Sequence, residues 1–413
     1  MLWLYLLFKP IKMKTKITIL FFSVLLLSCA KFKDTKTSGD QVNEVELTEG
    51  GMPMMSPSKV KFEKLQDNYA QKKRASIDKF CEKYWSNKNN NFSFLVAKDG
   101  QIIYERYQGV ANRRTKEIMT KETPLHIASV SKVLTATAIL MLVNVDKISL
   151  DQKVNTILTS FPYPEVTVRN LLSHRSGMRN YAYFTEDKGV WDRKTPLSNQ
   201  NVLDLLSEKN IKLESPTNTR FSYCNTNYAI LALIIEKITE LSYIQAMQEM
   251  IFKPLGMTNT YVFDYDKDRK RAIPSYKASN MELAIDYLDK VYGDKNIYST
   301  PRDLLKFDLA RNDPSFLKPE LRKEIYKGYS NERKGTKNYG LGIRMIEWET
   351  GQKFYFHNGW WHGNTSTYIP LINENVTIIG LSNKFTHNVY AARKLAPLFG
   401  DYPFKLEKGE KEE

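Results

Sequence analysis

The sequence predicts an α+β fold, in which helices flank one antiparallel sheet and an all-helical lobe is inserted into the chain. Two observations predict it: strand-like segments lie near both ends of the body of the chain, and helical patterns fill the long stretch between them. A sheet built from distant segments must bury its apolar face against such helices. With 413 residues and 42% hydrophobic content, the chain can bury a core of this kind. A functional site is expected in a cleft between the sheet and the helical lobe.

Residues 1–28 are predicted to be an export signal. Met13, the expected true start, opens a basic stretch, and the apolar run Ile17–Ser28 is too short to span a bilayer as an ordinary helix. The run ends in Leu-Leu-Ser-Cys, which resembles the lipobox of bacterial lipoproteins, so Cys29 is expected to carry a lipid and to begin the mature chain. We therefore expect an exported bacterial lipoprotein on the periplasmic face of a membrane, with plain secretion as the alternative.

Residues 29–61 are predicted to be a flexible linker. The segment is polar, is interrupted by glycine and proline, and has few periodic apolar positions. The folded domain is predicted over residues 62–405, and residues 406–413 form a charged tail. An amphipathic helix from Phe62 to Trp85 is expected to open the domain.

Strand and helix signals then alternate in blocks. A hairpin is predicted in "FSFLVAKDGQIIYERYQG", with its turn at Asp99-Gly100. Helical patterns run from Ser129 to about Tyr329. The C-terminal part returns to strands, predicted within residues 339–348, 353–359, 364–372 and 376–383. A last helix from Val389 to Leu398 closes the domain.

Charge and cysteine content limit the possible partners. The net charge of +15 falls to about +11 without the four lysines of the predicted signal, and could favour anionic surfaces or be an ordinary basic surface. No nucleic-acid-binding motif occurs, so nucleic acid is not an expected partner. The spacing of Cys81 and Cys224 indicates neither a metal site nor a disulfide framework. A single long-range disulfide between the two cysteines stays open as an alternative.

Ser129 is the first candidate catalytic residue. In "IASVSKVLTA" residues three apart share a helix face, so Lys132 is expected to lie over Ser129 and not over Ser131. In this Ser-x-x-Lys spacing a buried amine can take the proton of a nucleophilic hydroxyl. The apolar run that follows predicts a buried helix. A serine cap with a surface lysine is the structural alternative.

Three further stretches carry candidate residues. "RFSYCNTNYAIL" places Tyr223 and Asn225 before a long helix, "FYFHNGWWHG" places His357 and Gly359 at the end of a strand, and "VRNLLSHRSGM" marks a helix end at Gly177. Together with the Ser-x-x-Lys segment, they resemble the serine β-lactamase and penicillin-binding protein superfamily, on its branch of class C β-lactamases, D,D-carboxypeptidases and esterases. The likeness extends from about residue 70 to about residue 400 and implies a β-lactamase/transpeptidase-like fold.

The resemblance assigns an acylated nucleophile, its proton partner and a second acid/base group, which are in this order Ser129, Lys132 and Tyr223. Asn225 would bind the amide side chain of the substrate, and the strand from His357 to Gly359 would line the opposite wall of the cleft. The backbone N–H groups of Ser129 and Trp360 would form the oxyanion hole. Whether the Trp360 side chain lines the cleft or packs in the core stays open. No cofactor and no metal are implied.

Two positions depart from the pattern of this branch. Cys224 replaces a small serine or alanine and is interpreted as a packing residue, with a reactive low-pKa thiol as the alternative. His357 replaces the lysine of class C β-lactamases. Because a histidine with an ordinary pKa of about 6.5 is mostly neutral above pH 7, carboxylate binding is expected to weaken as the pH rises. His126 and His174 are expected to be structural.

The sequence thus predicts an exported serine hydrolase that forms an acyl-enzyme with an ester or amide, closer to a D,D-peptidase or esterase than to an efficient β-lactamase. Its substrate would be a small molecule or a peptide, with cell-wall peptides as one candidate. The alternatives are a class C-type β-lactamase and a catalytically silent member that binds peptidoglycan or a protein. A metal hydrolase is disfavoured, because His357 and His362 lie on a strand and a loop and no H-E-x-x-H motif occurs.

Overall fold

The computed structural model describes residues 45–86, 89–332 and 335–404, which belong to the unit Gln41–Glu413. The predicted signal, Cys29 and the charged tail lie outside the described residues. None of the helices in the described ranges has the length and hydrophobicity needed to cross a membrane.

Part of the predicted linker is folded. Met55 is buried in the hydrophobic core, and its N–H donates to the carbonyl oxygen of Met250 at 2.9 Å. The N–H of Lys61 donates to the carbonyl of Gly100 at 3.0 Å. Residues 45–61 therefore pack on the domain. The predicted linker boundary at residue 61 lies too far along the chain.

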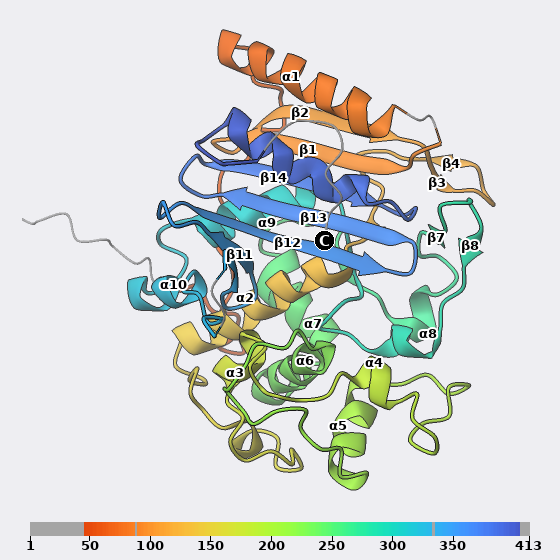
Figure 1. Cartoon of the computed structure of the whole chain (residues 1–413), viewed down its shortest axis with the longest axis vertical. Helices are drawn as coiled ribbons and strands as arrows, with labels where there is room; N and C mark the ends of the chain where they lie inside the picture. Colours follow the sequence, from red (N-terminus) through yellow and green to blue (C-terminus); the bar gives the residue numbers. More distant parts are fainter. Residues whose placement is uncertain (1–44, 87–88, 333–334, 405–413) are drawn as a thin grey trace, which may run out of the picture. The chain divides into compact units, whose positions relative to one another are not determined.

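Seven strands form the main antiparallel sheet, in the order β10-β11-β12-β13-β14-β1-β2. They are β1 (Phe92–Lys98), β2 (Gln101–Gln108), β10 (Lys337–Tyr339), β11 (Arg344–Glu347), β12 (Lys353–Trp361), β13 (Asn364–Leu371) and β14 (Val376–Ser382). The pairing of β1 with β14 joins the N-terminal and C-terminal parts of the chain (Figure 1), which confirms the predicted sheet from distant segments.

The predicted hairpin is present, with Asp99 and Gly100 both at positive φ in the turn between β1 and β2. The strand predicted over residues 339–348 is instead divided in two. The chain turns between β10 and β11, where the N–H of Gly340 donates to the carbonyl of Ile343 at 2.8 Å. Gly342 adopts a φ of +82°, and a Cβ on it would lie 2.3 Å from the Cβ of Ala136, so only glycine fits this turn.

Helix α1 (Asn68–Trp85) and the 3₁₀ helix η5 (Asn388–Leu398) cover one face of the sheet (Figure 1). The predicted last helix is thus present, in 3₁₀ form. Helix α1 begins at Asn68 rather than Phe62, because the side chain of Asp67 accepts from the N–H of Ala70 at 2.7 Å and caps the helix there.

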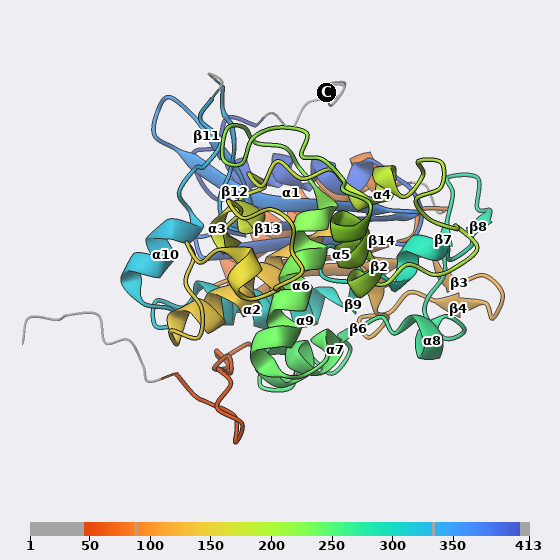
Figure 2. The ribbon, with the colours of Figure 1, turned by 90° about the horizontal axis from the view of Figure 1, so that it is seen from below.

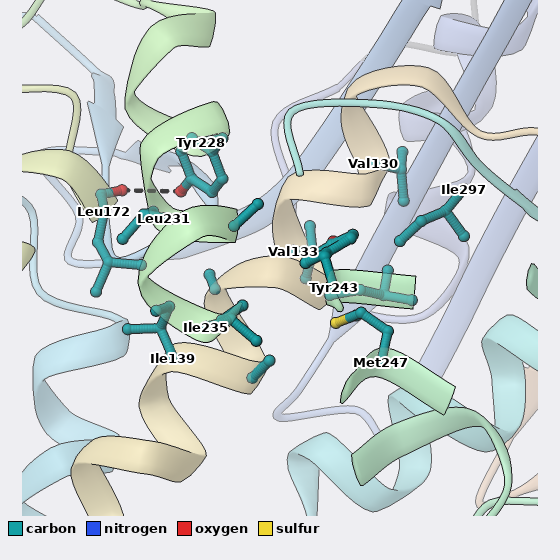
Figure 3. Close-up of a cluster of buried hydrophobic side chains, with 14 of the residues drawn as sticks. Val130, Val133, Ile139, Leu172, Tyr228, Leu231, Ile235, Tyr243, Met247 and Ile297 are labelled. Atoms are coloured by element: carbon teal, nitrogen blue, oxygen red, sulfur yellow. Dashed lines mark hydrogen bonds between the residues drawn. The ribbon is translucent and has the colours of Figure 1, made fainter. Parts of the chain in front are cut away.

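The other face carries the helical lobe (Figure 2), as predicted. Its helices are α2 (Ser131–Asn144), α3 (Val168–Leu172), α4 (Tyr181–Phe184), α5 (Asn199–Glu208), α6 (Asn225–Thr239), α7 (Tyr243–Met247), α8 (Tyr265–Asp268), α9 (Pro301–Asn312) and α10 (Pro319–Ile325), with shorter turns η2 (Val154–Thr156), η3 (Gln248–Phe252) and η4 (Tyr287–Lys290). Helices α2 and α6 are apolar on all sides and pack together at the centre. Figure 3 shows this contact, with the Tyr228 hydroxyl donating to the Leu172 carbonyl at 3.0 Å.

Short strands within the lobe region were not predicted. One small sheet joins β5 (Leu125–His126), β9 (Ile297–Ser299) and β6 (Tyr261–Val262), and two strand pairs join β3 (Val110–Asn112) to β4 (Glu117–Ile118) and β7 (Ser275–Tyr276) to β8 (Glu282–Leu283). The β5–β9 pairing has a functional consequence, because it holds the segment before β9 beside the start of α2.

Candidate active site

Ser129 lies in η1 (Ala128–Val130), a 3₁₀ turn directly before α2. The segment is anchored on both sides of the serine. The N–H of Ile127 donates to the carbonyl of Ile297 at 2.9 Å, and the N–H of Ala128 donates to Nδ1 of His126 at 3.0 Å. Ala128 has a φ of +48°, a left-handed conformation that is rare for alanine. The half-buried Ser129 thus lies on a tightly held, strained turn.

Lys132 lies over Ser129, in the helical register that the sequence predicts. The fully buried ammonium donates to the Ser129 hydroxyl at 3.2 Å and to the backbone carbonyl of Asp294 at 2.8 Å. The hydroxyl of Ser131 points elsewhere and accepts from the N–H of Ile297 at 3.2 Å. Lys132 is therefore positioned to act on Ser129 and not on Ser131.

Tyr223 brings a third functional group to this point from the segment before α6. The Lys132 ammonium lies 5.0 Å from the centre of the Tyr223 ring, and the guanidinium carbon of Arg344 lies 4.6 Å from it. The buried Tyr223 hydroxyl has no hydrogen-bond partner among the described residues. Burial acts to raise the pKa of Tyr223, but the charges of Lys132 and Arg344 outweigh burial and hold that pKa below its ordinary value.

Asn225 is the first residue of α6, and its buried Oδ1 lacks a hydrogen-bond partner among the described residues. An unpaired amide oxygen beside Tyr223 is available for a substrate N–H. Cys224, between them, is a free, buried thiol whose pKa burial raises to about 11, which favours the packing role over the reactive one. Cys81 is also free, so the bridge left open by the sequence is not formed. We call Ser129, Lys132, Tyr223 and Asn225 the helical wall.

Gly359 brings β12 against Ser129. A Cβ at this position would lie 2.9 Å from the backbone nitrogen of Ser129, 2.6 Å from the carbonyl oxygen of Ile127 and 2.3 Å from Oγ of Ser366. The lack of a side chain therefore permits the strand to pass directly beside the backbone N–H of Ser129. We call His357, Gly359 and Trp360 on β12, together with Arg344 on β11, the sheet wall.

His357 is completely buried. Its Nδ1 lies 2.9 Å from the carbonyl of Asn358, and its Nε2 lies 3.1 Å from the hydroxyl of Tyr339. Burial, aided by the charges of Arg344 and Lys132, lowers the pKa of His357 well below its ordinary value. The expectation that His357 would titrate between pH 6 and 8 and thereby weaken carboxylate binding is therefore wrong, because the ring stays neutral across this range.

The Trp360 side chain is 62% exposed and packs edge-on against Phe385 at 6.2 Å between ring centres. Alternate residues of a strand face opposite sides of the sheet, so Trp360 points away from the side that Gly359 shares with Trp361. Trp361 is the tryptophan of the pair that packs inward, where its Nε1 donates to Oδ1 of Asp289 at 2.6 Å. The Trp360 side chain thus neither packs in the core nor lies on the Gly359 side of the sheet, which answers the question left open by the sequence.

Arg344 is the functional candidate that the sequence reading missed. Among the described residues its guanidinium has no ion-pair partner and no side-chain hydrogen bond, and it lies over the Tyr223 ring. Arg344 lines a cavity of about 710 Å³ that also borders Arg220, Phe221 and Ser222, the residues just before Tyr223. The available signal was a cationic residue within the strand predicted over residues 339–348.

The two histidines expected to be structural lie directly behind the site. His174 is buried and its Nδ1 accepts from the N–H of Cys224 at 3.2 Å, while its ring centre lies 4.4 Å from that of Tyr223. His126 holds Ala128, as described above, and contacts Oδ1 of Asn296 at 2.9 Å through Nε2. Burial lowers the pKa of both rings, that of His126 to about 4. Each neutral ring therefore holds the backbone beside one residue of the helical wall.

Comparison with known proteins places this geometry in a family. The Beta-lactamase family model matches residues 77–397. Penicillin-binding protein 4* of Bacillus subtilis is 28% identical over 331 residues, which are 76% of this chain and 72% of that protein. A D-aminopeptidase of Brucella anthropi is 28% identical over 306 residues, which are 70% of this chain but only 55% of that protein.

A solved structure confirms the predicted fold. The crystal structure of a penicillin-binding protein from Bacillus halodurans superposes with a TM-score of 0.67 at 21% identity, covering 80% of this chain and all of the other. The predicted β-lactamase/transpeptidase-like architecture is therefore correct. The chain belongs to the β-lactamase family, and it is a serine hydrolase of the β-lactamase and penicillin-binding protein superfamily.

Proposed function

We propose that Ser129 is the nucleophile of an acyl-enzyme hydrolase, with Lys132 and Tyr223 as its proton-transfer partners. The observation that carries the proposal is the meeting of these three side chains. The Lys132 ammonium lies 3.2 Å from the Ser129 hydroxyl and 5.0 Å from the Tyr223 ring, although Tyr223 comes from the distant segment before α6. A nucleophile, a base and a cation in one buried group are what acyl transfer requires.

The reaction follows from this placement. Tyr223 acts as the phenolate, which its lowered pKa favours, and takes the proton of Ser129 as Oγ forms a bond to the substrate carbonyl carbon. The N–H of Ser129 and the N–H of Trp360 on β12 stabilise the oxyanion. The C–N or C–O bond then breaks, and the proton passes from Tyr223 to the leaving group. Tyr223 and Lys132 then activate a water molecule, which hydrolyses the acyl-enzyme and restores Ser129.

Arg344 supports a substrate that carries a carboxylate beside the scissile bond. Its guanidinium is permanently charged, is free of protein anions among the described residues and borders the cavity beside Tyr223. We infer that peptides with a free C-terminus are preferred to neutral esters, with the enzyme acting as a D,D-peptidase or D-amino-acid peptidase. The D-aminopeptidase relatives support a peptide or amide substrate.

The test is covalent labelling followed by mass spectrometry of the intact protein. A fluorophosphonate should add one label to the wild type and to Ser131→Ala, and none to Ser129→Ala. The serines lie two residues apart, so Ser131→Ala is a matched control. Labelling that persists in Ser129→Ala, or that depends on Ser131, would reject the assignment. Turnover of D-Ala-D-Ala peptides, neutral esters and penicillins by the wild type then ranks the substrates.

We further propose that the protein is exported and anchored through a lipid on Cys29. Support comes from the sequence alone, in the basic start after Met13 and the short apolar run that ends at the cysteine. In a bacterial host the wild type should incorporate labelled fatty acid and fractionate with membranes, and Cys29→Ser should do neither. Wild-type protein without lipid label would end this proposal and leave the hydrolase assignment untouched.

A further inference from the structure

Three potential metal ligands converge beside the sheet wall, outside the helical wall. His362 lies in the turn between β12 and β13, and its Nε2 is 3.0 Å from Oδ2 of Asp289 and 3.8 Å from Oδ2 of Asp286. The three ligand atoms all lie within 4.8 Å of one another. Two carboxylate oxygens and one imidazole nitrogen are a donor set that suits zinc.

The spacing is close to what a metal ion needs. Bonds of roughly 2.0–2.2 Å from Zn²⁺ to nitrogen and oxygen, arranged as a tetrahedron, put neighbouring ligand atoms about 3.3 Å apart. The two separations from His362, 3.0 and 3.8 Å, lie on either side of this value, and the two carboxylate oxygens lie within 4.8 Å of each other, so the side chains need to close in around an ion. Asp286 is 42% exposed and gives an ion a path from solvent, whereas Asp289 is buried.

Neighbouring groups already orient the ligands. Oδ1 of Asp289 accepts from Nε1 of Trp361 at 2.6 Å, and Oδ1 of Asp286 accepts from the N–H of Leu288 at 2.8 Å. Each carboxylate thus keeps Oδ2 toward His362, although Oδ2 of Asp289 also accepts from the N–H of Asp286 at 2.6 Å. Hydrogen bonds that orient the ligating groups in this way are typical of metal sites.

A further observation, at Asn364, points to a ligand at this cluster. Asn364 is 4% exposed, its Oδ1 has no hydrogen-bond partner among the described residues, and it lines the same cavity of about 350 Å³ as Asp289 and His362. Lys295, which contacts the Trp361 ring at 4.7 Å, donates to the hydroxyl of Tyr181 at 2.6 Å and to the Val291 carbonyl at 3.2 Å rather than to the carboxylates. Its ammonium lies 3.6 Å from Oδ1 of Asp294, and its charge still acts to lower the pKa of both Asp286 and Asp289.

We propose that Asp286, Asp289 and His362 bind one divalent transition-metal ion, with Zn²⁺ as the preferred ion. The side-chain Oδ1 of Asn364, which lines the same cavity as Asp289 and His362, is the candidate fourth ligand. The ion fastens the β12–β13 turn to η4 and so secures the end of the strand that carries Gly359. Its role is to stabilise the sheet wall, and it takes no part in acyl transfer.

The test uses the full-length protein, freed of metal with a chelator and titrated with Zn²⁺ by calorimetry. The wild type should bind one equivalent and show a higher Tm with Zn²⁺. Co²⁺ at the same site should give the visible absorption of a nitrogen–oxygen site. Asp286→Asn, which keeps the helix cap, and His362→Ala should each lower the affinity at least tenfold. His387→Ala, which removes an exposed imidazole elsewhere, is the matched control and should bind like the wild type.

Absence of Zn²⁺ binding by the wild type overturns the proposal. Binding that is unchanged in both His362→Ala and Asp286→Asn overturns it too, since the ion would then lie elsewhere. Because the readout is binding and not turnover, this result is independent of the assignment of Ser129. A protein that binds no zinc and still accepts a fluorophosphonate would separate the two proposals.

Discussion

The helical wall and the sheet wall differ in how their residues are brought together. Ser129 and Lys132 meet through one turn of a single helix, and their contact is fixed by sequence spacing. Gly359 meets Ser129 only because β12 pairs with β13 and passes η1. Local geometry thus brings Ser129 and Lys132 together, and long-range strand pairing places Gly359 of β12 beside Ser129.

This difference predicts how each wall responds to substitution. Changes in the helical wall should remove chemistry while leaving the fold intact, because its side chains project from helices that are packed by other residues. Changes in the sheet wall should alter position and substrate preference, because β12 and β11 act through their backbone and through charge.

The largest effect is expected from Lys132→Met, which keeps the length and apolar stem but removes the charge beside Ser129 and Tyr223. The rate of acylation should fall by roughly a thousandfold or more, as when one member of a catalytic unit is lost. Stopped-flow acylation by an activated ester measures it. Lys153→Met, at an exposed lysine, is the control and should acylate normally. Acylation of the Lys132→Met protein at the wild-type rate would contradict the proposed role.

Gly359→Ala should be the most damaging change in the sheet wall. The added methyl group would lie within 2.9 Å of the Ser129 nitrogen and must push β12 away from the nucleophile. We expect kcat/KM to fall by roughly a hundredfold, with a lower Tm. Gly50→Ala is the matched control, since its Cβ would meet nothing closer than 3.7 Å. A fully active Gly359→Ala enzyme would show that close backbone contact is not required.

The sheet wall contains the buried His357, and the buried His126 and His174 lie behind the helical wall. These three rings should make the protein sensitive to acid. The pKa of His126 is lowered to about 4 in the folded state, and those of His174 and His357 are lowered well below the unfolded value of about 6.5. Below pH 6.5 the unfolded chain therefore binds protons that the folded protein cannot, so stability is complete above pH 6.5 and falls as the pH is lowered.

His126 by itself should contribute a loss of about 3 kcal/mol by pH 4, from its shift of roughly 2.5 pKa units. Urea unfolding between pH 7.5 and 4.5 measures the total. His357→Gln, in the sheet wall, should make the free energy of unfolding less dependent on pH. His387→Gln, at an exposed histidine, should not. A free energy of unfolding that is constant over this range would show that the rings are protonated in the folded state.

Arg344→Gln should give the smallest effect, and one that depends on substrate. Loss of the cation should raise KM for a carboxylate-bearing peptide by roughly tenfold, with little change for a neutral ester. It should also move the acid limb of the kcat/KM profile to higher pH, because Arg344 helps to lower the pKa of Tyr223. Arg344→Lys should restore part of both effects. Equal losses for both substrates, with no shift of the profile, would reduce Arg344 to a packing residue.

The sequence allowed Ser129 and Lys132 to be located because their spacing is local information, whereas the roles of Tyr223 and Asn225 came from the family resemblance. The i, i+3 register placed Lys132 on Ser129, and the apolar run after it predicted α2. The burial of His357 could not be predicted, since it depends on Tyr339 from another strand. The position of Arg344 could not be predicted for a similar reason. The turn at Gly340 and Gly342 that starts β11 depends on contacts with Ala136 and Ile325.

The same limit explains the errors in the fold. The start of α1 was placed too early because the Asp67 cap competes with an apolar pattern that continues before it. The small β5–β9–β6 sheet was missed because two-residue and three-residue strands have no usable periodicity and are defined by their partners.

The pairing of β1 with β14 also dictates when this protein can fold. The strand at residues 92–98 is among the first to leave the ribosome, but its neighbour in the sheet, at residues 376–382, is among the last. The apolar edge of the β1–β2 hairpin therefore has no native partner during nearly all of synthesis. Such a high contact order slows folding and exposes strands that aggregate. A chain truncated before residue 376 should remain insoluble however complete its helical lobe, and the full chain can reach its native state only after β14 has been synthesised.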